Sequence, residues 1–179
     1  MDFKDYVKRY SDFPKKDVVF WDFTDLLKNP DARSAAIRQM LTFLKDKKID
    51  KIAAIEAKGF TIGSILAHEM NIPLVLIRKP NLIPGKVYSE TFVKEYGTGE
   101  YCIKADAVLP GERVAVIYDI MAGSGASLAA SHLIERMGGV IGGLLYVTEL
   151  DYLNGRTDLS SYELFSLVRI TEHDKAAEF

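Results

Sequence analysis

The sequence contains a single cysteine, Cys102, among its 179 residues. One thiol cannot close a disulfide within the chain, so we expect no disulfide framework and a reducing, cytoplasmic location. An excess of charge of one sign is also lacking, because 23 Lys and Arg offset 25 Asp and Glu and leave a net charge of −2. Nucleic-acid-binding proteins usually carry a basic excess, and we therefore expect no nucleic-acid partner.

Long apolar runs and linkers are missing as well. No segment approaches the ~20 consecutive apolar residues of a membrane span, and the first residues do not resemble an apolar secretory signal. We therefore expect no membrane association. Repeats, low-complexity tracts and Ser/Gly/Pro-rich linkers are absent, so residues 1–179 are predicted to form a single domain. With 48% hydrophobic residues, a chain of this length is able to bury a core.

Buried strands and helices alternate along the hydrophobic pattern. Nearly continuous apolar runs, typical of strands covered on both faces, occupy residues 51–56, 73–78, 113–119 and 140–148. The remaining pattern predicts helices over 3–10, 29–44, 61–70 and 125–137, and strands over 18–23 and 162–170. This order predicts a three-layer α/β fold, in which helices flank a mostly parallel sheet.

Residues 79–101 break this alternation. They contain two prolines and three glycines, and residues 87–93 alternate between apolar and polar side chains. The pattern predicts a long loop or a loose hairpin. Long excursions from a compact domain are usually lids or binding loops, so we expect a mobile segment over the functional site.

A loop of small residues gives the clearest chemical signal. Asp119 ends a predicted strand, and residues 122–127, Ala-Gly-Ser-Gly-Ala-Ser, lead into a predicted helix. Glycines allow several amides to point to one side, and a helix N-terminus adds partial positive charge, so the loop is able to cradle a phosphate, with Ser124 and Ser127 as hydroxyl donors. The alternative is a tight turn with Ser127 as the helix N-cap. Ligands bind at the carboxyl ends of parallel strands, so the site is expected after residues 55, 77 and 117.

Several segments, taken together and in order, resemble the type I phosphoribosyltransferase family, and within it the adenine phosphoribosyltransferases. They cover most of the chain and comprise Asp12-Phe13-Pro14, 18–22, Ile55-Glu56-Ala57-Lys58-Gly59-Phe60, 76–85, Glu95-Tyr96-Gly97, 119–127 and 149–156. The resemblance implies a homodimer that transfers ribose 5-phosphate from phosphoribosyl pyrophosphate (PRPP) to adenine, yielding AMP and pyrophosphate. It also implies Mg²⁺ as cofactor, held by PRPP and by Asp119 through water, without direct protein ligands.

The resemblance also assigns roles to individual residues. Glu95 is the catalytic residue, which assists proton movement at the base. The PRPP site comprises Ala57, Lys58 and Gly59 at the pyrophosphate, Arg78 and Lys79 as a clamp, Asp119 at the ribose hydroxyls, and Ala122, Gly123, Ser124, Gly125, Ala126 and Ser127 at the 5′-phosphate. The base site comprises Val18, Phe20, Trp21 and Ile120.

Each role has a plainer alternative. Lys58 is otherwise a solvated surface lysine, which is the commoner environment of lysine. Arg78 and Lys79 would form ion pairs at the rim, Glu95 would be an exposed loop residue, and Trp21 would fill the core. The remaining base-site residues are likewise more often plain core residues.

Several positions depart from the family pattern. Tyr118 stands where the family usually has a second acid beside Asp119, and a phenol brings no charge near pH 7. Lys58 replaces an arginine of the pyrophosphate loop, and Trp21 replaces an arginine of the base site. In the phosphate loop, two registers place either Gly and Ala or the two serines at the usual threonine positions. These departures leave open transfer to hypoxanthine, guanine or xanthine, and a regulator that binds PRPP or a nucleotide without catalysis.

Overall fold

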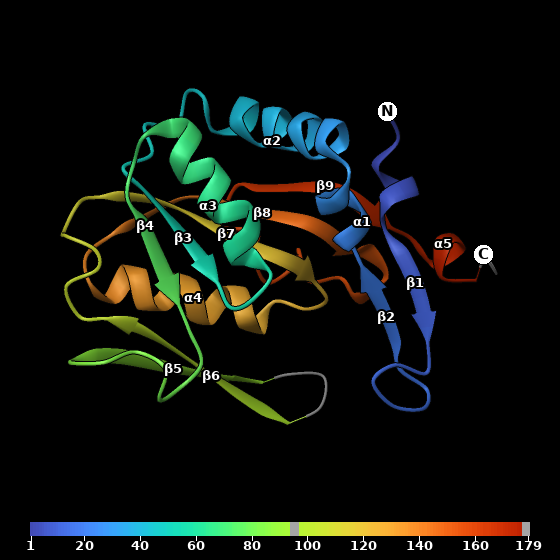
Figure 1. Ribbon diagram of the computed structural model, residues 1–179. Coiled ribbons are helices and arrows are strands. Elements are labelled where there is room, and N and C mark those ends of the chain that lie inside the picture. The colour runs from blue at the N-terminus through green and yellow to red at the C-terminus, as the bar shows by residue number, and fades with distance from the viewer. Residues whose placement is uncertain (94–96, 177–179) are drawn as a thin grey trace.

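A five-stranded parallel sheet forms the centre of the computed structural model, which describes residues 1–93 and 97–176 (Figure 1). The strands lie in the order β4-β3-β7-β8-β9, and every neighbouring pair is parallel. Their bounds are β3 Lys51–Ile55, β4 Leu74–Ile77, β7 Arg113–Met121, β8 Val140–Leu150 and β9 Leu164–Ile170. The four apolar runs of the sequence are thus β3, β4, β7 and β8, and β9 is the predicted edge strand.

Helices cover both faces of this sheet. The helices α2 (Pro30–Leu44) and α3 (Gly59–Met70) lie on one face, and α4 (Gly125–Arg136) lies on the other (Figure 1). The start of α2 follows the signal in the sequence, because the Asn29 side chain accepts a hydrogen bond from the Ala32 N–H at 3.0 Å and a proline occupies the first turn. The predicted three-layer α/β fold is therefore confirmed.

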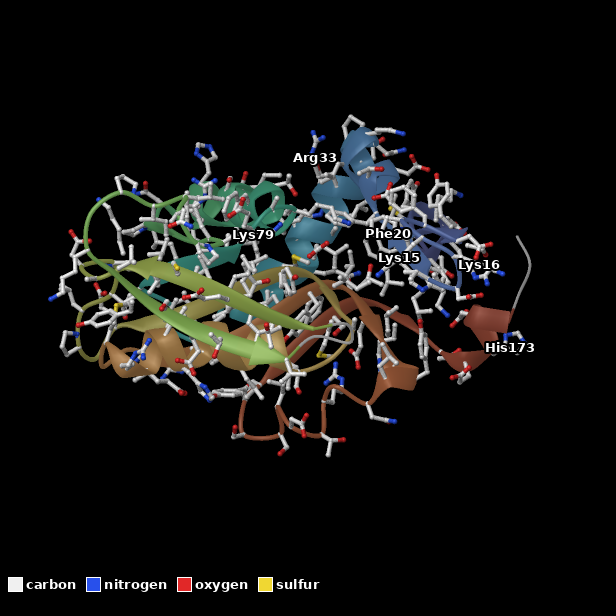
Figure 2. All side chains as sticks on the ribbon, turned by 90° about the horizontal axis from the view of Figure 1, so that it is seen from below. Lys15, Lys16, Phe20, Arg33, Lys79 and His173 are labelled. Carbon is white, nitrogen blue, oxygen red and sulfur yellow. The ribbon has the colours of Figure 1, made fainter. Side chains whose placement is uncertain are left out.

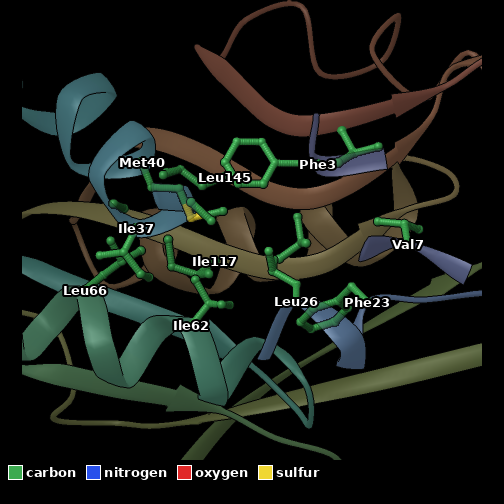
Figure 3. Close-up of a cluster of buried hydrophobic side chains, with 14 of the residues drawn as sticks. Phe3, Val7, Phe23, Leu26, Ile37, Met40, Ile62, Leu66, Ile117 and Leu145 are labelled. Atoms are coloured by element: carbon green, nitrogen blue, oxygen red, sulfur yellow. The ribbon is translucent and has the colours of Figure 1, made fainter. Parts of the chain in front are cut away.

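The core consists of two apolar clusters, one on each face of the sheet. Figure 3 shows part of the first cluster, in which side chains from α2 and α3 meet Ile117 of β7 and Leu145 of β8. In the second cluster, α4 and the neighbouring strand β6 (Thr98–Lys104) cover the opposite face. Strands covered on both faces need apolar side chains at successive positions, which explains their continuous apolar runs.

Two antiparallel hairpins extend from this frame. In the first, β1 (Lys8–Ser11) pairs with β2 (Val19–Asp22), so the helix predicted over 3–10 is wrong beyond the short 3₁₀ helix Phe3–Tyr6. Pairing with β2, which follows later in the chain, overrides the local helical pattern. A helix α1 (Thr24–Lys28) connects this hairpin to α2.

The second hairpin occupies the segment that breaks the alternation in the sequence. Strand β5 (Val87–Val93) pairs with β6 in a continuous antiparallel register that runs from Val87 opposite Lys104 to Val93 opposite Thr98. The hairpin interpretation of residues 79–101 is therefore correct, and its regular ladder extends beyond that segment to Lys104. Movement of the hairpin stays a prediction. Within the part of the chain that the structure describes, no helix combines the length and apolar character needed to cross a bilayer.

Candidate active site

A cavity of about 670 Å³ opens at the carboxyl ends of β3 and β7. It is bounded by the loop after β3, the loop between β7 and α4, and the ends of the β5–β6 hairpin. Of the residues predicted from the sequence, those that line it are Ala57, Lys58, Lys79, Asp119, Ile120, Ala122, Gly123, Gly125 and Ala126. The site therefore lies where the fold predicts it, at the strand ends of a parallel sheet.

An ion pair occupies the floor of the cavity. The carboxylate of Asp119, which is only 6% exposed, lies 3.1 Å from Lys58 Nζ. Burial raises the pKa of Asp119, while the adjacent ammonium partly opposes this shift. The same Nζ lies 4.6 Å from the centre of the Phe20 ring and 4.0 Å from the Asp22 carboxylate. Lys58 is therefore held inside the site and is not a solvated surface lysine.

The loop after β3 is fixed from two sides. Gly59 begins α3, and a Cβ at this position would lie 2.8 Å from the carbonyl oxygen of Ile117 in β7, so only glycine allows this close approach. Burial alone would raise the pKa of the Glu56 carboxyl. Hydrogen bonds from the Lys79 N–H at 3.0 Å and from Arg78 at 3.3 Å outweigh this effect and hold the pKa below its usual value. The backbone of residues 56–59 is therefore anchored beside Asp119.

The two predicted clamp residues point to different places. Lys79 lines the cavity, and Figure 2, seen from the side of the β5–β6 hairpin, shows it near the middle of the molecule. Arg78 does not line the cavity, because its guanidinium donates to Glu56 and, at 2.9 Å, to the Leu82 carbonyl. The backbone of Arg78 bonds to Cys102 of β6, which turns its side chain toward a second hollow beside β4. Arg78 thus forms an ion pair with Glu56, as the alternative interpretation of its role predicts.

The loop between β7 and α4 presents backbone to the cavity. Gly123, Gly125 and Ala126 line it, whereas Ser124 donates to Asp158 at 2.5 Å and Ser127 accepts from the buried Tyr146 hydroxyl at 2.8 Å. The side chain of Ser124, which precedes α4, makes no capping bond, and Ser127 lies inside the helix and is not its N-cap. The first N–H groups of α4 therefore remain available to an anion.

The predicted base-site residues divide into two groups. Ile120 lines the cavity, whereas Phe20 does not line it but contacts the ammonium of Lys58, which does. Val18, just before β2, and Trp21 do not line the cavity either. Trp21 is 4% exposed and belongs to the first core cluster. It therefore fills the core, as the alternative interpretation of this residue predicts. The candidate catalytic residue, Glu95, lies outside the described residues.

The cavity also contains aromatic residues that sequence reasoning missed. Phe92 of β5 and Tyr101 of β6 both line it, and their ring centres are 4.7 Å apart. The Tyr101 hydroxyl donates to the Tyr118 hydroxyl at 3.2 Å. The alternation of apolar and polar side chains over residues 87–93 indicates that one face of the hairpin is apolar. It does not indicate against which part of the molecule that face packs. Among residues 1–93 and 97–176, no cluster of three potential metal-ligating side chains of the His, Cys, Asp or Glu types occurs.

We expect Gly125→Ala to destabilise the protein by about 1–3 kcal/mol, because overpacking of a close contact costs this amount. A Cβ at Gly125 would lie 2.5 Å from the carbonyl oxygen of Val93, at the end of β5. Gly123→Ala is the matched control, since a Cβ there meets nothing within 4 Å. Urea denaturation of both variants provides the measurement. Equal stabilities would show that the hairpin does not press against the start of α4.

The sheet order, the hairpin over the cavity and the small-residue loop before α4 define the architecture of a type I phosphoribosyltransferase. No protein-family model matches the sequence. The adenine phosphoribosyltransferase of Desulfitobacterium hafniense is 38% identical over 169 residues, which cover 94% of this chain and 98% of the relative. That of Streptococcus thermophilus is 40% identical over 163 residues, which cover 91% and 95%. The chain belongs to the adenine phosphoribosyltransferase family.

Solved structures agree with this assignment. The adenine phosphoribosyltransferase of Thermoanaerobacter pseudethanolicus has a TM-score of 0.89 and 37% identity, and the match covers 93% of this chain and 97% of that structure. The Saccharomyces cerevisiae enzyme, solved with an imino-altritol bisphosphate and adenine, has a TM-score of 0.84 and 31% identity, with 92% and 96% covered. The resemblance inferred from the sequence motifs is thereby confirmed.

Proposed function

We propose that the protein transfers ribose 5-phosphate from PRPP to adenine and releases AMP and pyrophosphate. The observation that carries this proposal is the cavity in which Asp119, Lys58 and the N-terminus of α4 converge at the end of β7. Its relatives are named adenine phosphoribosyltransferase, and the yeast structure was solved with adenine. The enzyme would act in purine salvage, in the cytoplasm and as a homodimer.

The reaction breaks the bond between C1 of the ribose and the pyrophosphate oxygen and forms a bond from C1 to a ring nitrogen of the base. Positive charge grows on the ribose and negative charge on the leaving group, so positioning and electrostatics are what the protein must supply. Lys58, Lys79 and the backbone of 57–59 would hold the pyrophosphate. The first turn of α4 would bind the 5′-phosphate through its N–H groups.

The remaining roles concern the ribose and the base. Asp119 would accept a hydrogen bond from a ribose hydroxyl, while Ile120 and Phe20 offer apolar surface to the purine. Glu95 would assist proton movement at the base, in agreement with its place in the resemblance. Mg²⁺ would neutralise the pyrophosphate oxygens when it is bound. The site offers this ion the carboxylate of Asp119. A single carboxylate is compatible with Mg²⁺, because this ion keeps several waters and binds through substrate phosphates with few protein ligands.

Calorimetry followed by a product assay tests the proposal. PRPP with Mg²⁺ is titrated into the protein, and turnover is then measured with adenine, hypoxanthine, guanine and xanthine separately. We expect PRPP binding and AMP formation from adenine. Product from another base alone would reassign the substrate, whereas PRPP or nucleotide binding without any product would indicate a regulator.

A further inference from the structure

The segment after β8, residues 151–159, packs against the loop between β7 and α4. A Cβ at Gly155 would lie 3.2 Å from the carbonyl carbon of Gly123, so the two backbones are in close contact. The Ser124 hydroxyl donates to Asp158 at 2.5 Å, which adds a side-chain contact between the same two segments. The place where the 5′-phosphate is proposed to bind therefore has a carboxylate beside it.

Asp158 is an exposed residue in a fixed segment. Arg156, two positions earlier, pairs with the buried Glu149, and Leu159, directly after Asp158, is fully buried in the second core cluster. In the part of the chain that the structure describes, no basic side chain pairs with Asp158. An exposed carboxylate is ionised at neutral pH, so the Ser124 hydroxyl faces a full negative charge.

Ser124 has a single proton to donate. It lies directly before α4, between Gly123 and Gly125, which both line the cavity. A serine in this position reaches the first N–H groups of the helix when it adopts the usual capping geometry, and a bound phosphate would lie at those groups. In this structure the proton goes to Asp158 instead. One hydroxyl donates one hydrogen bond, so it does not serve Asp158 and a phosphate at the same time.

The backbone of the loop does not depend on this hydrogen bond. The Ser124 carbonyl accepts from the Leu128 N–H at 2.9 Å, which ties Ser124 to the first turn of α4. Ser127 is held separately, because its hydroxyl accepts from the buried Tyr146 hydroxyl at 2.8 Å. Removal of the Asp158 carboxylate would therefore release the Ser124 hydroxyl and leave the amides of the loop in place.

We propose that Asp158 is a positioning residue that competes with the 5′-phosphate of PRPP and AMP for the hydroxyl of Ser124. This inference rests on the proposed function. When a phosphate binds at the start of α4, the hydroxyl either leaves Asp158 or turns a lone pair toward the phosphate, and both outcomes weaken binding. Because substrate and product carry the same 5′-phosphate, the competition weakens both. Such uniform weakening raises KM and does not lower kcat.

Asp158→Ala tests this inference by calorimetry with AMP and by steady-state kinetics. We expect the Kd of AMP and the KM of PRPP to fall roughly three- to tenfold, as the gain of one hydrogen bond does. The KM of adenine should change less than twofold, and kcat should not rise. Asp158→Asn should give a smaller gain, because its amide oxygen still accepts from Ser124 but carries no charge.

Two further variants separate competition from charge. In a Ser124→Ala background, Asp158→Ala should change the Kd of AMP less than twofold, because the group for which Asp158 competes is gone. Asp151→Ala is the matched control, since it removes an equal charge from the same segment. Asp151 contacts Arg169 and does not line the cavity, so this variant should bind AMP like the unmodified protein.

Two results would overturn the competition while the proposed function stands. One is that AMP binds and Asp158→Ala leaves its Kd unchanged or raises it. The other is an equal gain from Asp158→Ala with and without the Ser124 hydroxyl, which would assign the effect to charge alone. If the unmodified protein binds neither AMP nor PRPP, the proposed function fails and this inference fails with it.

Discussion

Replacing Glu95 with glutamine should lower kcat by ~10²–10⁴-fold, the usual contribution of a general acid or base. Glutamine keeps the shape of the side chain but neither gives nor takes a proton at neutral pH. Because the proposed partner of Glu95 is the base and not PRPP, the Kd of PRPP should change less than twofold. Single-turnover measurements of AMP formation, combined with calorimetry of PRPP, separate these two effects.

A glutamate of strand β5 provides the matched control. Glu90 lies on β5 outside the cavity, where it contacts His132 and Arg136 of α4. Glu90→Gln should therefore leave the chemical step unchanged. An unaltered single-turnover rate for Glu95→Gln, or an equal loss in both variants, would remove Glu95 from its catalytic role.

Arg156→Met should destabilise the fold by about 3 kcal/mol or more, because it leaves a buried carboxylate without its main partner. Glu149, at the end of β8, is 1% exposed and accepts two hydrogen bonds from Arg156, at 2.6 and 2.8 Å. Arg169 lies farther away, at 3.5 Å, and replaces only part of this interaction. Urea denaturation at neutral pH measures the loss.

Two further variants separate charge from packing. The double variant Glu149→Gln with Arg156→Met removes both charges and should recover much of the stability, as removal of both members of a buried pair often does. Arg169→Met should cost less than about 1 kcal/mol, because the Arg169 side chain is half exposed, its contact with Glu149 is long at 3.5 Å, and its other partner, Asp151, is itself exposed. A loss for Arg156→Met no greater than for Arg169→Met would contradict the importance of the buried pair.

The central layer was predictable because its signals are local. Four apolar runs gave β3, β4, β7 and β8, and the Asn29-Pro30 pair marked the start of α2. The predicted helix over residues 3–10 failed where β1 gains its hydrogen bonds from β2, a partner that local spacing does not reveal. Helix periodicity describes a segment alone, whereas strand pairing depends on a second segment.

The site was predictable only in part for a similar reason. Motifs identified the loops that hold Lys58, Asp119 and Gly125, and these residues do converge. The direction of Arg78 depends on a backbone bridge to Cys102, and the approach of Tyr101 to the cavity depends on how the hairpin packs. Both are contacts between distant segments, and residue types along one segment do not specify them.

The position of β7 in the sheet also affects how the chain folds. β7 lies directly beside β3, and its first residue, Arg113, donates its N–H to Asp50, 63 positions earlier. A pairing of this kind closes a long loop before it gains any contact, and topologies rich in such pairings fold slowly. During synthesis, we therefore expect the edge of β3 that faces β7 to stay unpaired while α3, β4 and the hairpin emerge. The cavity, which needs the ends of both strands, is therefore expected to form only once β7 has left the ribosome.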